Sequence, residues 1–238
     1  MRGIFVVLFV AALAARAHAQ SGAEQWEQCN EPSSLDTVIK ACTEVIDAKR
    51  EPRDRLAMAF NNRGYAYTRK SQYERAMSDL DQSIRLDPRD PLAYNNRGYA
   101  WTRQDQHERA VADFSRAIDL EPDYGAAFNN RCWSRAILGA LIDALADCDE
   151  SLKIRPDGVT ALDSRGFVYL KLGRPEQAIA DYDTALQQRP RSATSLYGRG
   201  VAYLKQSDQE KGRRDIAAAE QIDPDVAAKF RQWGVTAP

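Results

Sequence analysis

The sequence contains very little histidine: two residues among 238, of which only His107 lies beyond the first nineteen residues. It also lacks a glycine-rich phosphate loop ending in Lys-Ser/Thr, a Gly-x-Ser-x-Gly elbow and a Cys–His pair. His107 stands in a polar turn beside Glu108, where a solvated histidine is the ordinary expectation. The four cysteines form no Cys-x-x-Cys motif and have no histidine cluster near them. We therefore predict no catalytic site, no metal site and no cofactor.

A surplus of basic charge is absent as well. The chain has 33 lysine and arginine residues against 34 aspartate and glutamate residues, a net charge of −1. Without Arg2 and Arg16 of the amino-terminal segment the balance is 31 against 34, or −3. Nucleic acids and anionic membranes recruit basic surfaces. The composition therefore favours neither as a partner.

No apolar run is long enough to cross a membrane. The run from Ile4 to Ala15 has twelve residues, too few for a hydrocarbon core of ~30 Å, so a retained anchor is the weaker alternative. It follows Arg2 and precedes Ala17-His18-Ala19, a pattern typical of a secretory signal peptide. No cysteine stands at the cleavage point to carry a lipid. We predict a signal peptide over residues 1–19, cleavage before Gln20, and an exported chain without stable membrane insertion, periplasmic if the source is bacterial.

What the sequence does contain is a repeat of 34 residues. Prolines recur at this interval at Pro88, Pro122, Pro156, Pro190 and Pro224. Within residues 91–124 the large–small–aromatic–Ala–aromatic–Pro pattern is filled by Tyr94, Gly98, Trp101, Ala110, Phe114 and Pro122. This pattern resembles the tetratricopeptide repeat family, in an exported form whose repeats carry Asn-Arg-Gly. The resemblance covers residues 57–224 and implies an all-α, right-handed solenoid of helix–turn–helix units.

Five full units are expected, at residues 57–90, 91–124, 125–158, 159–192 and 193–224. Residues 20–56 are predicted to form a degenerate leading hairpin, with Ser34 capping its second helix. In each full unit the proline should end the second helix. Glycines in the middle of first helices cost about 1 kcal/mol each, which indicates close approach of a neighbouring helix. Residues 225–238 are predicted to form an amphipathic capping helix through Val226, Phe230 and Trp233; a partner-binding helix is the alternative.

An arginine and an aspartate sixteen residues later occupy the same two positions in all five units. A guanidinium near a helix seam requires a carboxylate partner, because an unpaired buried charge is expensive. We therefore predict structural ion pairs; pairing between repeats and a binding surface for anionic ligands are the alternatives. The predicted pairs are Arg63–Asp79, Arg97–Asp113, Arg131–Asp147, Arg165–Asp181 and Arg199–Asp215.

The four cysteines permit three pairings. Cys132 replaces the close-approach glycine of its unit, and Cys148 takes the matching place on the facing helix, where a Cβ separation of ~3.8 Å is attainable. Cys29 and Cys42 repeat this arrangement in the leading hairpin. Because an exported chain meets an oxidising compartment, we predict the disulfides Cys29–Cys42 and Cys132–Cys148. Four buried thiols are the alternative.

The resemblance also implies that the first helices line a concave groove. Helical spacing places one amide and aromatic stripe on that face, and asparagine can pair with a peptide backbone. The predicted peptide-binding groove consists of Asn61, Asn62, Tyr65, Asn95, Asn96, Tyr99, Asn129, Asn130, Trp133 and Phe167. The alternative is that these side chains only pack and bond across the array. The family's two-carboxylate clamp needs lysines where Met58, Leu92, Asn61 and Asn95 stand.

We therefore predict a non-enzymatic adaptor or scaffold of the cell envelope that holds an extended segment of a protein partner. The alternative function is a structural spacer or self-assembling subunit. An open groove lined by aromatic and asparagine side chains favours the adaptor. A groove filled by the chain's own side chains favours the spacer. The sequence does not identify the partner.

Overall fold

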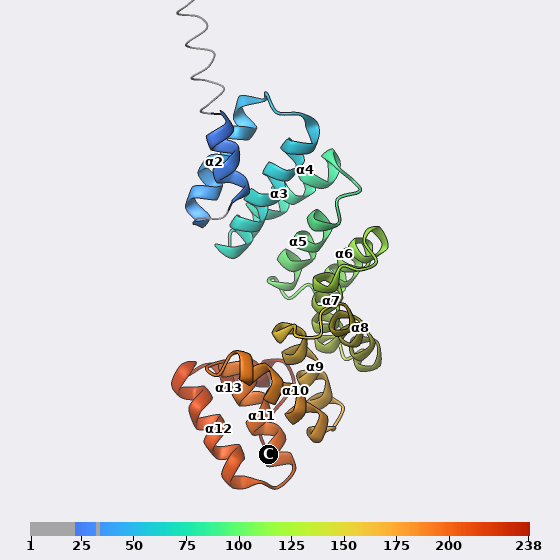
Figure 1. Cartoon of the computed structure of the whole chain (residues 1–238), viewed down its shortest axis with the longest axis vertical. Coiled ribbons are helices and arrows are strands. Elements are labelled where there is room, and N and C mark those ends of the chain that lie inside the picture. The colour runs from blue at the N-terminus through green and yellow to red at the C-terminus, as the bar shows by residue number, and fades with distance from the viewer. Residues whose placement is uncertain (1–21, 32–33) are drawn as a thin grey trace, which may run out of the picture. The chain divides into compact units, whose positions relative to one another are not determined.

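The computed structural model describes residues 22–31 and 34–238, and every regular element among them is a helix (Figure 1). The predicted signal peptide, residues 1–19, and its cleavage point before Gln20 lie outside the described residues. The chain divides into two compact units, Met1–Asp105 and Gln106–Pro238. We call them the amino-terminal and carboxy-terminal units and describe each by itself.

The amino-terminal unit begins with a helix over residues 22–30. It continues with α2 (Leu35–Ala48), α3 (Arg53–Arg69), α4 (Tyr73–Leu86) and α5 (Pro91–Thr102). Ser34 caps α2, as predicted: its hydroxyl accepts from the Thr37 N–H at 3.1 Å. Helix α3 packs against α2, α4 and α5. The leading hairpin is thus followed by a regular hairpin and a further first helix.

The carboxy-terminal unit contains three complete hairpins between one leading and one closing helix. Hairpin partners pack against each other, and the first helices α7, α9 and α11 are also neighbours. This arrangement leaves the second helices on the other side of the unit. Its elements are α6 (His107–Leu120), α7 (Gly125–Ile137), α8 (Leu141–Ile154), α9 (Val159–Lys171), α10 (Pro175–Gln188), α11 (Ala193–Lys205), α12 (Gln209–Ile222) and α13 (Val226–Gln232).

His107 corrects a sequence-based expectation. It was expected to be solvated, but it is the first residue of α6 and only 7% exposed. A residue that the sequence places in a polar turn is therefore a buried residue of a helix. The boundary between the two units falls just before it, inside predicted repeat 91–124.

The periodic prolines determine where the second helices end. Each of α4, α6, α8, α10 and α12 closes on a residue with non-helical backbone that directly precedes a proline. Proline disfavours helical backbone at the residue before it and cannot donate a hydrogen bond. These five closing residues are Asp87, Glu121, Arg155, Arg189 and Asp223. Three are acidic and two, in consecutive repeats, are arginine.

The glycines in the middle of first helices lie where a second helix approaches closely. A Cβ on Gly64 would stand 2.8 Å from Leu80 Cγ, and one on Gly200 would stand 2.8 Å from Ile216 Cγ1. Real Cβ contacts are essentially never that short. At Gly200 the facing residue is Gly212, whose carbonyl oxygen would lie 3.0 Å away. The predicted close approach is therefore confirmed at these two positions.

Helix α13 buries Val226 and Phe230, the residues of its predicted apolar face, at 0% and 2% exposure. It packs against α11 and α12. Phe230 also reaches the first helices: its ring lies 4.7 Å from that of Tyr197 and 6.0 Å from that of Phe167. The closing helix therefore covers part of the face that was predicted to bind a peptide.

Candidate functional site

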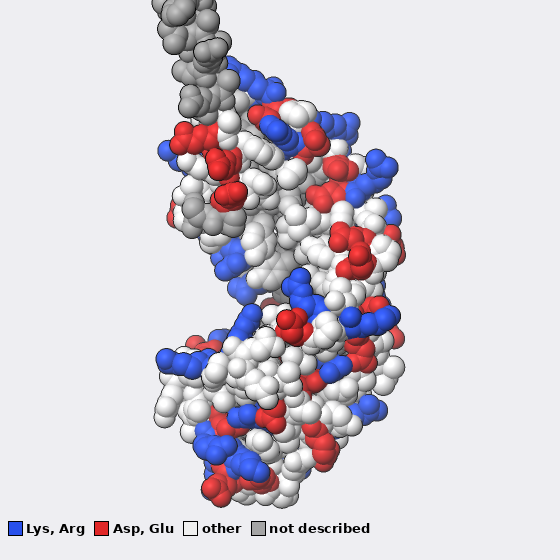
Figure 2. Space-filling view, in the orientation of Figure 1, with Lys and Arg blue, Asp and Glu red and all other residues white. Residues whose placement is uncertain are grey.

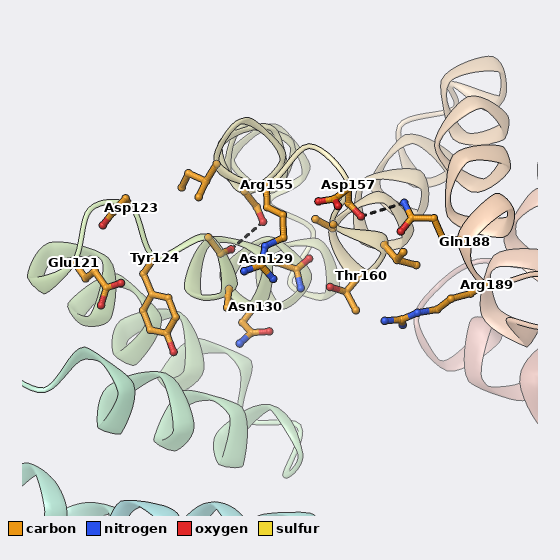
Figure 3. Close-up of a pocket in the computed structure, with 17 residues that line it drawn as sticks. Glu121, Asp123, Tyr124, Asn129, Asn130, Arg155, Asp157, Thr160, Gln188 and Arg189 are labelled. Carbon is orange, nitrogen blue, oxygen red and sulfur yellow. Dashed lines mark hydrogen bonds between the residues drawn. The ribbon is translucent and has the colours of Figure 1, made fainter. Parts of the chain in front are cut away.

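The carboxy-terminal unit contains a pocket of about 690 Å³ beside the first turns of α7 and α9 (Figure 3). Three connections complete its wall: α6–α7, α8–α9 and α10–α11. We call it the α7–α9 pocket. Its polar lining includes Glu121, Asp123, Tyr124, Asn129, Asn130, Arg155, Asp157, Thr160, Gln188 and Arg189.

Two of the predicted groove residues, Asn129 and Asn130, line this pocket from α7. The side-chain oxygen of Asn129 is buried and accepts no hydrogen bond from any described residue. A buried acceptor without a donor is costly, so such an atom marks a place where a ligand donor would be favoured. A peptide N–H is a donor of the right kind.

Hydrogen bonds within the pocket wall hold two of its connections in place. Ser151 Oγ donates to the Gly125 carbonyl at 2.8 Å and ties α8 to the start of α7. Gln188 Nε2 donates to the Asp157 carbonyl at 3.1 Å and ties α10 to the α8–α9 connection (Figure 3). The wall is thus organised without Asn129.

The predicted asparagines of the amino-terminal unit are engaged within the protein. Asn96 Nδ2 donates to Asn61 Oδ1 at 3.0 Å between α5 and α3, and both side chains are buried. Asn62 Nδ2 donates to the Cys29 carbonyl at 3.3 Å. Asn95 is 7% exposed. These contacts match the alternative in which asparagines bond across the array. The α7–α9 pocket differs in this respect, because the Asn129 oxygen there has no donor.

The predicted aromatic stripe differs between the two units. In the amino-terminal unit Tyr65 is 36% exposed, and its ring lies 6.2 Å from that of Tyr99. Arg69 donates to the Tyr65 hydroxyl at 3.1 Å. This pair remains accessible on the surface of the first helices.

In the carboxy-terminal unit the closing segment covers the stripe. The Trp133 ring lies 5.0 Å from Phe167 and 4.9 Å, edge-on, from Trp233. Lys171 Nζ donates to the Trp233 carbonyl at 3.2 Å and to the Ala136 carbonyl at 2.8 Å. Phe167 is only 1% exposed as a result. Sequence periodicity could place these rings on one face but could not show that the chain itself would cover them.

A carboxyl group lies beneath this cover. Asp163, at the edge of a cavity of about 100 Å³ lined also by Trp133 and Trp233, accepts a hydrogen bond from Ser195 Oγ. Burial raises the pKa of Asp163 to about 6, against the hydrogen bond from Ser195 and the charge of Arg189, which lower it.

The arginine ladder, defined as the five periodic arginines, connects helices both within and between repeats. Within repeats, four of the predicted pairs lie at 2.6–2.9 Å. Arg63–Asp79, Arg131–Asp147 and Arg165–Asp181 each use two parallel N–H···O bonds, and Arg199–Asp215 uses one. The fifth, Arg97–Asp113, joins residues of different units and stays a prediction.

The remaining nitrogen of each guanidinium reaches back to the preceding second helix. The acceptors are Thr43 for Arg63, Asp81 for Arg97, Ser115 for Arg131, Asp149 for Arg165 and Asp183 for Arg199, at 2.7–2.9 Å. The within-repeat carboxylates are buried, whereas the side chains of Asp81, Asp149 and Asp183 are 43–52% exposed. The hydrogen bond to Asp181 raises the pKa of Arg165, so this arginine keeps its charge.

The structure joins Cys29 to Cys42, with a Cα–Cα distance of 4.8 Å, and Cys132 to Cys148, at 5.4 Å. All four side chains are at most 1% exposed. The first disulfide fixes the helix over residues 22–30 to α2. The second joins α7, which carries Asn129 and Asn130, to α8. It therefore stabilises one wall of the α7–α9 pocket.

Sequence reasoning missed Arg155, Thr160 and Arg189. In Figure 3 the Arg155 side chain points from the end of α8 toward Asn129, and Arg189 points into the pocket from the end of α10. The two arginines had a signal in the repeat: they occupy the position that is acidic in the other three units. Comparing the repeats at that position would have identified them.

Three further observations concern the surface charge, membrane-spanning helices and metal sites. On the visible face of each unit, basic and acidic side chains are interspersed (Figure 2). No helix in the part of the chain that the structure describes is long and apolar enough to cross a membrane. Within residues 22–31 and 34–238, no group of three or more His, Cys, Asp or Glu side chains could hold a metal ion.

Helices paired in hairpins and a 34-residue sequence period define a helical-repeat protein. Two family models, each described as tetratricopeptide repeat, match residues 64–137 and 165–227. The chain belongs to the tetratricopeptide repeat family, whose members are generally non-enzymatic adaptors for other proteins. Among curated proteins, none matches the sequence.

Solved structures of this family share the fold. The crystal structure of YrrB, "a TPR protein with an unusual peptide-binding site", is 20% identical over 83% of this chain and 100% of that chain, with a TM-score of 0.58. MamA protein is 15% identical over 75% and 95%, with a TM-score of 0.59. Pseudomonas aeruginosa pilF is 15% identical over 76% and 87%, with a TM-score of 0.64. At these identities the likeness concerns the fold alone.

Proposed function

We propose that this protein is an exported adaptor of the cell envelope that holds an extended segment of another protein in the α7–α9 pocket. The family supports a protein or peptide partner. The observation that carries the proposal is the buried Asn129 oxygen without a donor, at a pocket of about 690 Å³. A single extended strand of peptide would supply the missing N–H and fill the space.

Export is the second part of the proposal. The first nineteen residues have the pattern of a signal peptide. Two disulfides in a chain of this size favour an oxidising compartment. YrrB, which is described as having a peptide-binding site, provides a precedent within the fold for this kind of ligand.

One observation favours the alternative of a spacer or self-assembling subunit. The closing segment packs on Trp133 and Phe167, which leaves Trp133 only partly exposed and Phe167 1% exposed. We therefore place the binding site at the α7–α9 pocket and not along the whole predicted stripe. The exposed Tyr65 belongs to a separate surface.

Blocking the α7–α9 pocket should abolish peptide binding. Linear peptides selected from a random displayed library against the full, oxidised chain would be titrated against variants. Thr160 is exposed at the pocket wall, so Thr160→Trp should weaken binding more than tenfold by filling the space. Asn129→Ala should weaken it about fivefold, the loss of one hydrogen bond of ~1 kcal/mol.

Thr184→Trp is the matched control, because Thr184 is an exposed helical threonine on α10 that does not line the pocket. It should change the dissociation constant less than twofold. Circular dichroism would verify that all variants keep their helicity. Selected peptides that bind Thr160→Trp as well as the original chain would refute the pocket as the binding site.

A further inference from the structure

Arg155 and Arg189 break the repeat pattern at one position. The residue before the periodic proline is Asp87, Glu121 and Asp223 in three repeats, and arginine in the two consecutive repeats that border the α7–α9 pocket. A basic residue also complements the partial negative charge at the carboxyl end of a helix, so what distinguishes these two positions is their place at the pocket. Both arginines line the pocket.

The two arginines also differ from the arginine ladder in their partners. Every ladder arginine is held by one or more acceptors at 2.6–2.9 Å. Arg155 and Arg189 are both exposed, and within the described residues neither side chain forms an ion pair or a hydrogen bond with the protein. Their donors are therefore free to meet a ligand.

The charges around the pocket are unevenly placed. Glu121 and Asp123 lie at the α6–α7 connection, at one end of the view in Figure 3, whereas Arg189 enters from the other end and Arg155 lies between. Asp157 belongs to the α8–α9 connection. The charge of Arg189 acts on Asp163, whose carboxylate accepts a hydrogen bond from Ser195 Oγ. A ligand with one or two carboxylates at the arginine end fits this field better than a long acidic run.

We propose that Arg155 and Arg189 form a subsite for a carboxylate of the bound peptide, so that the partner segment carries an acidic residue or a free carboxyl terminus at this point. The proposal rests on the proposed function and adds the chemistry of the ligand. Guanidinium groups suit this task because their planar donors match a carboxylate in pairs. Asn129 would then hold the backbone beside the carboxylate.

The test uses peptides selected from a random linear library by the full, oxidised chain. The selected set should be enriched in Asp or Glu at one position. For a synthetic peptide of that set, changing the acid to its amide should weaken binding more than tenfold. Arg155→Glu and Arg189→Glu should each weaken binding of the acidic peptide more than tenfold and binding of the amide peptide less than threefold.

Glutamate is tolerated at this site, since Glu121 closes α6 in the same way, so these variants are expected to fold. Arg213→Glu is the matched control: it makes the same charge change at an exposed residue of α12 outside the pocket, and it should leave binding within twofold. Peptides with free and amidated carboxyl termini distinguish a side-chain carboxylate from a terminal one. Either source supports the proposal.

Two results would overturn the inference, and they are distinguishable. Peptides that require an unblocked pocket but show no acidic preference, with unchanged affinity in Arg155→Glu and Arg189→Glu, would leave the proposed function standing and remove the carboxylate subsite. Failure to select any peptide that Thr160→Trp blocks would remove the proposed function, and the subsite with it.

Discussion

Replacing Asp147 by alanine is expected to lower the free energy of unfolding of the carboxy-terminal unit by about 3 kcal/mol. The Asp147 side chain is 5% exposed and accepts two bonds from Arg131, at 2.7 and 2.9 Å, and one from Arg135, at 2.7 Å. Its removal leaves two guanidinium groups at a helix seam without their carboxylate. Breaking one side of a buried pair costs much more than the pair contributes, because the remaining charge stays desolvated.

Asp149→Ala is the matched control on the same helix. Asp149 also accepts from a ladder arginine, Arg165, at 2.8 Å, but its side chain is 52% exposed and Arg165 keeps its bonds to Asp181. An exposed pair contributes 0–1 kcal/mol, so the control should change stability by no more than that. Urea unfolding followed by circular dichroism measures both variants. Equal effects of the two substitutions would show that burial does not distinguish the two carboxylates of the ladder.

Removing the Cys132–Cys148 disulfide by the double substitution Cys132→Ala, Cys148→Ala should also cost about 3 kcal/mol. The bond closes a loop with a sequence separation of 16, and in the chain-entropy account a loop of about 15 residues contributes ~3 kcal/mol by restricting the unfolded chain. Alanine is close in size to the glycine that the other repeats have at the Cys132 position. At the Cys148 position the other repeats have the larger Leu80, Phe114, Tyr182 and Ile216, so the variant also loses some packing there. The effect should appear in thermal unfolding without reductant.

Reductant provides the control for this prediction. It should destabilise the carboxy-terminal unit of the original chain and have no further effect on that unit in the double variant. The Cys29–Cys42 bond responds independently, because it lies in the amino-terminal unit. Four free thiols in protein recovered after export would contradict both the pairing and the oxidising compartment on which it depends.

The sequence predicted the helices and their pairing well because the repeat encodes them locally. A proline every 34 residues ends each second helix, and a glycine or cysteine at one place brings the hairpin together. An arginine sixteen residues before an aspartate can be paired from helix geometry alone. These features depend on distances within one hairpin, which the chain length between them determines.

The candidate site was predicted less well because it depends on contacts between repeats. The Asn61–Asn96 bond and the second bond of Arg165, to Asp149, join neighbouring repeats. Their geometry follows from the angle between successive hairpins, which no local pattern specifies. The cover of Trp133 by Trp233 joins residues a hundred positions apart. The α7–α9 pocket also depends on contacts between repeats, because its wall comes from three connections.

Site-specific photo-crosslinking in the producing cell tests the central claim most directly. A photoreactive amino acid would be placed at Asp157, in the α8–α9 connection at the pocket, and separately at Ile142, which is 68% exposed on α8 and outside the pocket. We predict a discrete adduct with a second protein from position 157, reduced by Thr160→Trp in the same chain, and none from position 142. An adduct from position 142 with none from 157 would contradict binding at the α7–α9 pocket and favour a spacer that makes contact through its second helices.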